Sequence, residues 1–187
     1  MTDADCTYLL VDGENIDATL GNSILGDRPS PEQRPRWDRV RSFATQLWGR
    51  PCKALFFLNA SSGVLPVSFV QALMAMNYRP IPLSGGRDQK VVDIAVLRTL
   101  EALRERPGHV LLASHDADFA PALAGLLGGE RRVGVLGFHE FMSGSFRELV
   151  EQGLEIHDLE SGAHAFNTPL PRLRIIPVGE FDPAEFL

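Results

Sequence analysis

The sequence predicts an α/β domain: a single doubly wound unit with a mainly parallel sheet of five or six strands and helices on both faces. Two observations lead to this prediction. Short apolar, β-rich runs alternate with helical patterns over residues 1–158, which is the rhythm of βαβ units. The strand runs are also almost continuously apolar, as strands covered on both faces are. Connections between such parallel strands are expected to be right-handed crossovers.

The individual elements follow from this alternation. We expect strands at Tyr8–Val11, Ala54–Leu58, Tyr78–Pro82, Val110–Ala113, Arg132–Leu136 and Leu154–His157. We expect helices near Glu14–Ile24, Trp37–Trp48, Pro66–Met76, Lys90–Arg104, Phe119–Leu127 and Ser143–Gln152. The segment Gly26–Pro35 contains three prolines among charged residues, so it is predicted to be an exposed and rather stiff loop.

The alternation stops after Asp158, and residues 159–187 are interpreted as a C-terminal extension. Within it, Arg172–Val178 is predicted to add an edge strand or to pack across the body, because Pro177 disfavours a central strand. The end of the chain is acidic and aromatic, with Phe181 and Phe186 among three acids. We expect it to dock on the domain or on a second subunit, and the second case would make the protein a homodimer.

Composition narrows the class of protein. The 187 residues fit one domain, and 44% apolar with 22% charged residues is ordinary for a soluble globular chain. No run approaches the roughly 18–20 apolar residues of a membrane span, and the acidic start is unlike a signal peptide. Cys6 and Cys52 are expected to be buried thiols in a reducing cytoplasm, not zinc ligands or a disulfide. The net charge of −6 argues against a general nucleic-acid coat protein but is compatible with a nuclease.

Four aspartates carry the functional prediction. Asp12 follows the first predicted strand, and Asp116 and Asp118 follow the fourth, so the sheet brings them to one edge. Asp93 lies early in a helix that is apolar nearly all round, which predicts deep burial. Carboxylates gathered in this way repel one another unless a hard divalent metal neutralises them. We therefore expect Mg²⁺ or Mn²⁺ chemistry on phosphate, with all four aspartates as catalytic residues and metal ligands.

Structural roles compete with this interpretation. Asp12 and one of the Asp116–Asp118 pair are well placed to cap the helices that follow them. Asp93 could instead form a salt bridge to Lys90 or Arg98, although a charge buried in such a helix favours a functional site.

Several polar residues near these acids are candidates for substrate binding. Asn15, one turn after Asp12, is placed to orient that carboxylate or to contact substrate, and Ser114 adds a hydroxyl at the end of the fourth strand. Lys90 could steady a scissile phosphate or be a solvated residue at a helix start. His115 could contact substrate, but an exposed turn residue is the favoured interpretation. The remaining candidates are arginines: Arg87 in the loop before the helix of Asp93, and Arg34 and Arg36 in the segment 27–41, which holds five arginines against three acids.

At these residues the chain resembles the NYN domain, a branch of the PIN-like nuclease superfamily. The resemblance rests on three motifs: Val11–Asn15, Lys90–Asp93 and Ser114–Phe119. It covers roughly residues 7–158 and implies a PIN-like fold with metal-dependent cleavage of RNA by the four aspartates. Many members carry a further acid about six residues after the position of Asp93, where this chain has Thr99, and glycine at the position of His115.

The leading hypothesis is therefore a cytoplasmic Mg²⁺- or Mn²⁺-dependent ribonuclease. The alternative is a catalytically weak or inactive module of the same fold that binds RNA or a protein, which the residue Thr99 and the acidic net charge favour. A phosphatase with an aspartyl nucleophile is disfavoured. Haloacid-dehalogenase-type enzymes need a second aspartate two residues after the nucleophile, and that position is Glu14.

Overall fold

Six parallel strands form one sheet in the computed structural model, which describes residues 6–172, 177–185 and 187. The strands are β1 (Thr7–Asp12), β2 (Cys52–Asn59), β3 (Tyr78–Leu83), β4 (His109–Ala113), β5 (Val133–Gly137) and β6 (Leu154–Asp158). Their order across the sheet is β3-β2-β1-β4-β5-β6, and every neighbouring pair is parallel. The prediction of a mainly parallel sheet of five or six strands is confirmed.

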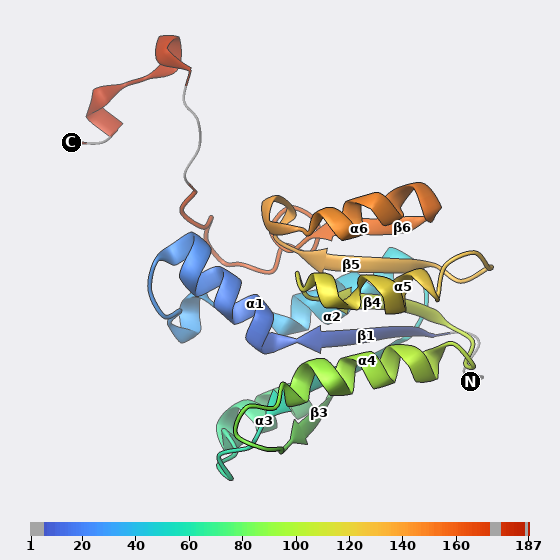
Figure 1. Cartoon of the computed structure of the whole chain (residues 1–187). Helices are drawn as coiled ribbons and strands as arrows, with labels where there is room; N and C mark the ends of the chain where they lie inside the picture. The colour runs from blue at the N-terminus through green and yellow to red at the C-terminus, as the bar shows by residue number, and fades with distance from the viewer. Residues whose placement is uncertain (1–5, 173–176, 186) are drawn as a thin grey trace.

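Helices cover both faces of this sheet, as predicted (Figure 1). One core lies between the sheet and α1 (Gly13–Thr19), α2 (Trp37–Leu47) and α3 (Val67–Ala75). The other lies beneath α4 (Val91–Leu103), α5 (Ala120–Ala124) and α6 (Gly144–Glu148). Successive residues of β1 alternate between the two, with Leu9 in the first core and Leu10 in the second. Both faces of β1 are thus buried, which explains why its sequence is apolar throughout.

The predicted helix Glu14–Ile24 is divided. The α-helical part ends at Thr19, and residues Leu20–Leu25 continue as a π-helical segment that ends at Gly26, whose φ of 72° suits glycine. The loop that follows contains a 3₁₀ turn, Pro31–Gln33, closed by a capping box between Ser30 and Gln33. The sequence predicts that this loop is exposed. The structure differs in part, because Pro29 and Pro35 are buried.

The last two helices are shorter than predicted. In place of one helix over 119–127, a 3₁₀ turn (Ala117–Phe119) leads into α5, which ends at Gly125. In place of one helix over 143–152, α6 gives way to a 3₁₀ turn (Leu149–Gln152), which ends at Gly153 with φ 105°. The first of these changes matters for the site, because the 3₁₀ turn holds Asp118.

The chain beyond β6 begins by packing on the same core as α1 and α2. Leu159, Ala163, Ala165 and Leu170 are buried there. The backbone N–H of Arg36 donates to the carbonyl of Ala165 at 2.6 Å, which joins this segment to the start of α2. Two 3₁₀ turns follow, Val178–Glu180, which is exposed, and Pro183–Glu185. The predicted edge strand Arg172–Val178 falls largely on residues 173–176, which lie outside the described residues, as does Phe186 of the predicted docking end.

Two smaller expectations concern cysteine and membrane spans. Cys6 and Cys52 are both buried, as predicted. Within the described ranges, the helices are too short or too polar for any of them to span a bilayer.

Candidate active site

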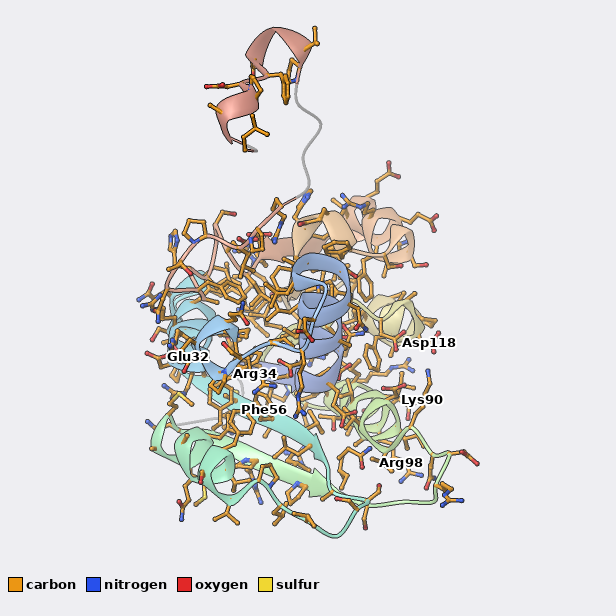
Figure 2. All side chains as sticks on the ribbon, turned by 90° about the vertical axis from the view of Figure 1, so that its left-hand side faces the viewer. Glu32, Arg34, Phe56, Lys90, Arg98 and Asp118 are labelled. Carbon is orange, nitrogen blue, oxygen red and sulfur yellow. The ribbon has the colours of Figure 1, made fainter. Side chains whose placement is uncertain are left out.

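The acidic residues meet at the carboxyl ends of β1 and β4, where the order in which the chain adds strands reverses. From β1 the chain moves outward to β2 and β3, and from β4 it moves the opposite way to β5 and β6. In open α/β sheets, the gap at the carboxyl ends of two such central strands is where ligands bind. Asp12 is the last residue of β1, and Ser114–Asp118 follow β4 directly. Figure 2 looks onto this edge, with Lys90 and Asp118 on one side of α1 and Arg34 and Phe56 on the other.

Asp12 is the most buried of the four aspartates, with 1% of its surface exposed. Its Oδ1 accepts a hydrogen bond from the backbone N–H of Asn15 at 3.2 Å, so Asp12 caps α1. Its Oδ2 accepts one from the hydroxyl of Ser114 at 3.1 Å. Burial, together with the negative charges of Asp93 and Glu14, raises the pKa of Asp12 to about 6 despite both hydrogen bonds, and burial is the largest of these causes. The Asp12 carboxylate is therefore held in place by two hydrogen bonds, and no cation among the residues that the structure describes is one of the groups that shift its pKa.

The turn after β4 is a short chain of hydrogen bonds. Ser114 is fully buried, and its oxygen accepts from the backbone N–H of Asp116 at 3.2 Å. Asp116 Oδ1 accepts from the backbone N–H of Asp118 at 2.9 Å, which caps the 3₁₀ turn. Ser114, predicted to bind substrate, is thus occupied in positioning Asp12 and Asp116, because the hydroxyl lies beneath them. Asp118 is exposed at the rim.

Asp93 lies in the first turn of α4 beside Lys90. The Lys90 Nζ is 3.3 Å from Asp93 Oδ2, which is the salt bridge that competed with a functional role in the sequence. The predicted deep burial of Asp93 is wrong, since its side chain is 23% exposed. The helix α4 begins at the carboxyl-end edge of the sheet, where Val91 and Val92 are buried in the core while the side chain of Asp93 stays partly exposed.

Lys90 faces three of the four aspartates. A hydrogen bond to Asp93 and the charges of Asp93, Asp116 and Asp118 raise the pKa of its ammonium group. The side chain is 71% exposed, so it is held by charge and not by packing. The structure thus brings all four predicted aspartates to one edge of the sheet and places one lysine among them.

The donor chemistry of this group fits a hard divalent cation. The four aspartates offer only carboxylate oxygens. The pKa of Asp12 is raised mainly by burial and further by the charges of Asp93 and Glu14, so a bound cation would stabilise its ionised form. As the side chains stand, no three Asp, Glu, His or Cys residues of the described part of the chain converge closely enough to hold a metal ion. The oxygens of Asp12, Asp93 and Asp116 are directed to the hydrogen bonds and the ion pair given above, and the Asp118 side chain is exposed. Closing around a cation therefore requires rotation of Asp93, Asp116 and Asp118.

His115 is not the exposed turn residue that the sequence suggested. It is buried, and its ring stacks on Phe138 with the two planes 5° apart. Ring Nε2 accepts from the backbone N–H of Phe138 at 2.8 Å, so Nδ1 carries the proton and faces Asn15 Oδ1 at 3.0 Å and Thr19 Oγ1 at 3.2 Å. Burial lowers the pKa of His115 to about 4, and the ring is neutral at physiological pH.

Asn15 is committed to the same network. Besides the ring, its Oδ1 accepts from the backbone N–H of His115 at 2.8 Å, which ties α1 to the turn after β4. Room for the imidazole exists because residue 137 is glycine, where a Cβ would lie 2.5 Å from Nε2. Sequence patterns do not predict these two contacts, because Asn15 is 100 residues and Gly137 is 22 residues from His115.

The predicted arginines divide into two groups. Arg34 and Arg36 line a cleft of about 820 Å³ on the other side of α1, between the loop before α2 and the helix α3. Arg34 is not free, because its Nε lies 3.0 Å from Asp17 Oδ1. Arg87 is exposed in the loop before α4, on the side of Lys90. The sequence reasoning missed the cleft, whose floor is made of aromatic side chains from β2 and α3.

Comparison with known proteins agrees with this geometry. The NYN domain family matches residues 7–159 of the chain. A crystal structure described as a protein of unknown function from Vibrio parahaemolyticus superposes with a TM-score of 0.65 at 16% identity, covering 87% of this chain and 97% of that one. At that identity the likeness supports the fold alone. No protein with a curated function matches the chain.

Proposed function

This chain belongs to the NYN domain family, and on that premise we propose that it is a cytoplasmic ribonuclease that hydrolyses RNA phosphodiester bonds with Mg²⁺ or Mn²⁺. NYN domains are generally ribonucleases, which supports the reaction class and RNA as the substrate. The observation that carries the proposal is the arrangement at the junction of β1 and β4. Four aspartates from three separate segments surround this point, and Lys90 faces three of them, Asp93, Asp116 and Asp118.

Asp12, Asp93, Asp116 and Asp118 would hold the metal. A bound divalent ion supplies Lewis-acid stabilisation of the phosphate and a more acidic water for in-line attack. Asp12 is kept in position by Asn15 and Ser114 whether or not the site is occupied. Because Asp93, Asp116 and Asp118 are partly or fully exposed, their carboxylates can turn toward a cation without repacking the core.

Lys90 and the arginines would hold the RNA. Lys90 is paired to Asp93 and largely exposed, so its ammonium group can exchange Asp93 for a phosphate oxygen once the carboxylate turns to metal. Arg87 lies on the same side, whereas Arg34 and Arg36 lie across α1. RNA bound by both groups would cross the acidic edge between them. The −6 net charge makes such a defined path more favourable than binding over the whole surface.

A binding module without catalysis is the second candidate. Thr99, where many family members carry an acid, donates its hydroxyl to the carbonyl of Ala95 at 2.7 Å within α4. It supplies no carboxylate, and Lys90 already offsets part of the negative charge of the other acids. Such a module would bind RNA or a protein and leave every RNA intact.

The test is incubation with labelled single-stranded and structured RNAs in Mn²⁺ and in EDTA. Asp116→Asn is the disabling variant, because asparagine keeps the oxygen that accepts from the Asp118 N–H and removes the charge. Glu101→Gln is the matched control, an exposed acid near the far end of α4. We expect Mn²⁺-dependent cleavage by wild type and Glu101→Gln and none by Asp116→Asn. Binding without cleavage by wild type would select the module, and equal cleavage by all three would point to a contaminant.

A further inference from the structure

The cleft across α1 from the acidic edge has the composition of a base-binding pocket. Its volume of about 820 Å³ lies within the range of small-molecule sites. The apolar lining comes from α2, β2 and α3, and includes Trp37, Phe56, Phe57, Phe69 and Met76. Three arginines, Arg28, Arg34 and Arg36, stand along one wall.

The aromatic residues are a rigid cluster, and one of them is accessible. The Phe56 ring packs edge-to-face against Trp37 at 5.0 Å and against Phe69 at 5.4 Å between centroids. Trp37 and Phe56 are buried, which fixes the floor, whereas Phe69 is only partly buried. A planar ligand entering the cleft can therefore stack on Phe69 without disturbing the core. RNA-binding proteins commonly recognise unpaired bases by stacking on aromatic side chains of this kind.

The charged groups of the cleft match a nucleotide. The Nε of Arg34 is engaged by Asp17, so that acid is neutralised within the wall. Arg28 is exposed and Arg36 half-buried, and both are placed to meet a phosphate. Glu14 and Asp38 also line the cleft, and their oxygens can accept hydrogen bonds from ring or amino N–H groups of a base.

The cleft adjoins the acidic edge at the start of α1. Gly13 follows Asp12 directly and lines the cleft, and a Cβ on Gly13 would lie 2.6 Å from the Phe56 ring. The floor of the cleft thus touches the residue next to the most buried aspartate. Glu14, whose pKa is raised by burial and then by the charge of Asp93, lines the cleft on the same side.

We propose that this cleft binds one unpaired nucleotide of the RNA substrate, with its base stacked on Phe69 and its phosphate facing Arg28 and Arg36. The inference rests on the proposed function for the identity of the polymer. It specifies single-stranded RNA near the cleavage point, because a paired base cannot enter the cleft. The base contact fixes which phosphodiester bond crosses the acidic edge.

A blocking variant tests the pocket without touching the acids. Ala72 is an exposed residue of α3 that lines the cleft, and Ala75 is an exposed residue of the same helix that does not. Ala72→Phe fills the cleft, and Ala75→Phe adds the same side chain outside it. Phe69→Leu removes the stacking surface, and Phe43→Leu is its control, a partly buried phenylalanine of the same core that packs on His157 instead.

The first measurement does not depend on cleavage. Saturation-transfer NMR with the four ribonucleoside 5′-monophosphates is compared with ribose 5-phosphate, which lacks a base. We expect saturable binding of at least one nucleotide by wild type, Ala75→Phe and Phe43→Leu, and much weaker binding of the sugar phosphate. Ala72→Phe and Phe69→Leu should weaken nucleotide binding about 5- to 100-fold. Nucleotide binding that Ala72→Phe leaves unchanged would overturn the proposal.

The second measurement places the pocket on the substrate. Single abasic positions are introduced in turn into an RNA that the protein cleaves or binds. We expect one position, at a fixed distance from the cleaved bond, to lower the rate or affinity in wild type and to have no further effect in Phe69→Leu. A flat profile on a cleaved RNA would refute the pocket and leave the ribonuclease intact. Nucleotide binding that Ala72→Phe abolishes, in a protein that cleaves no RNA, would support the pocket and reject the enzyme.

Discussion

Asn15 and His115, 100 residues apart in the chain, are joined by two hydrogen bonds to a single oxygen. Asn15 Oδ1 accepts from the backbone N–H of His115 at 2.8 Å and from its ring Nδ1 at 3.0 Å. The first turn of α1 and the turn after β4 are thereby fixed to one another. These two segments carry Asp12 and Asp116, so this contact sets the relative position of the acids.

Replacing Asn15 with Ala is expected to destabilise the fold by about 1–3 kcal/mol, because the buried backbone N–H of His115 loses its acceptor. Urea unfolding measures the loss. Asn22→Ala is the control, since Asn22 is an exposed residue of the π-helical segment that follows α1. Asn15→Ala should also weaken Mn²⁺ binding by displacing the two turns. Unchanged stability with lost RNA binding would instead make Asn15 a substrate contact.

Acid should remove the contribution of His115. Burial lowers the pKa of His115 to about 4 from the 6.5 of an unfolded histidine. As pH falls, the unfolded chain takes up the proton first, so the stabilisation is complete above pH 6.5 and is lost from pH 6.5 toward 4. The loss is on the order of 3 kcal/mol. NMR of the ring nitrogens in EDTA checks the cause, and the Nδ1-protonated neutral ring should persist to about pH 4. A ring that titrates near 6.5 would contradict the burial.

Asp12→Asn should stabilise the protein when metal is absent. Burial raises the pKa of Asp12 from 3.8 to about 6, so at pH 7.5 the fold contains an unfavourable charge. Asparagine keeps an oxygen for the Asn15 N–H and removes that charge, for a gain of roughly 1–3 kcal/mol in EDTA. The folded state of wild type binds the Asp12 proton first as pH falls, so the gain should shrink from pH 6 toward 3.8. Unfolding curves at several pH values test this, and a gain independent of pH would exclude the cause.

Asp93→Asn separates a metal ligand from a structural salt bridge. The Lys90–Asp93 pair is solvent-accessible, and such pairs contribute about 0–1 kcal/mol. In EDTA we expect the variant to melt no lower than wild type, because one of several crowded negative charges is removed. The rise in melting temperature that Mn²⁺ gives wild type should disappear. A clear loss of stability in EDTA, with the response to Mn²⁺ retained, would show that Asp93 is structural.

Lys90→Gln should bind Mn²⁺ several-fold more tightly than wild type and cleave RNA more slowly. The Lys90 ammonium group competes with a cation for Asp93 and also repels it, and both effects vanish in the variant. Calorimetric titration of Mn²⁺ and single-turnover cleavage measure the two effects. Arg98→Gln, an exposed cation about two turns further along α4, is the control. Weaker metal binding by Lys90→Gln would place the cation site away from Asp93.

Arg36→Gln should weaken RNA binding across sequences and lower the slope of log affinity against log salt by about 1. Arg36 is preferred to Arg34 for this test, because removing Arg34 would also strand Asp17. Anisotropy titrations with single-stranded RNA at several salt concentrations give the slope. Arg79→Gln is the control. Arg79 is an exposed arginine near the amino end of β3, whereas the acids lie at the carboxyl ends of the strands. An unchanged slope would move the phosphate path to Arg87 and Lys90.

The sequence alone determined the elements and the place of the acids. An apolar run such as Leu9–Val11 is satisfied where both faces of a strand are covered, and the alternation of such runs with helical patterns favours a parallel sheet between two helical layers. Once the sheet is parallel, a residue that ends β1 and one that follows β4 must share an edge. The convergence of Asp12 and Asp116 therefore follows from the positions of the predicted strands along the sequence.

The tertiary structure alone decided how each side chain is used. His115 is an ordinary turn residue until Asn15, Thr19 and Phe138 surround it, and none of the three is near it in sequence. Asp93 lies in an apolar helix, yet its place in the first turn of α4 leaves its carboxylate 23% exposed and paired with Lys90. The aromatic cleft exists only because β2, α3 and the loop before α2 meet beside Gly13. Burial and partner choice depend on contacts between distant segments, and periodicity in one segment carries no information about them.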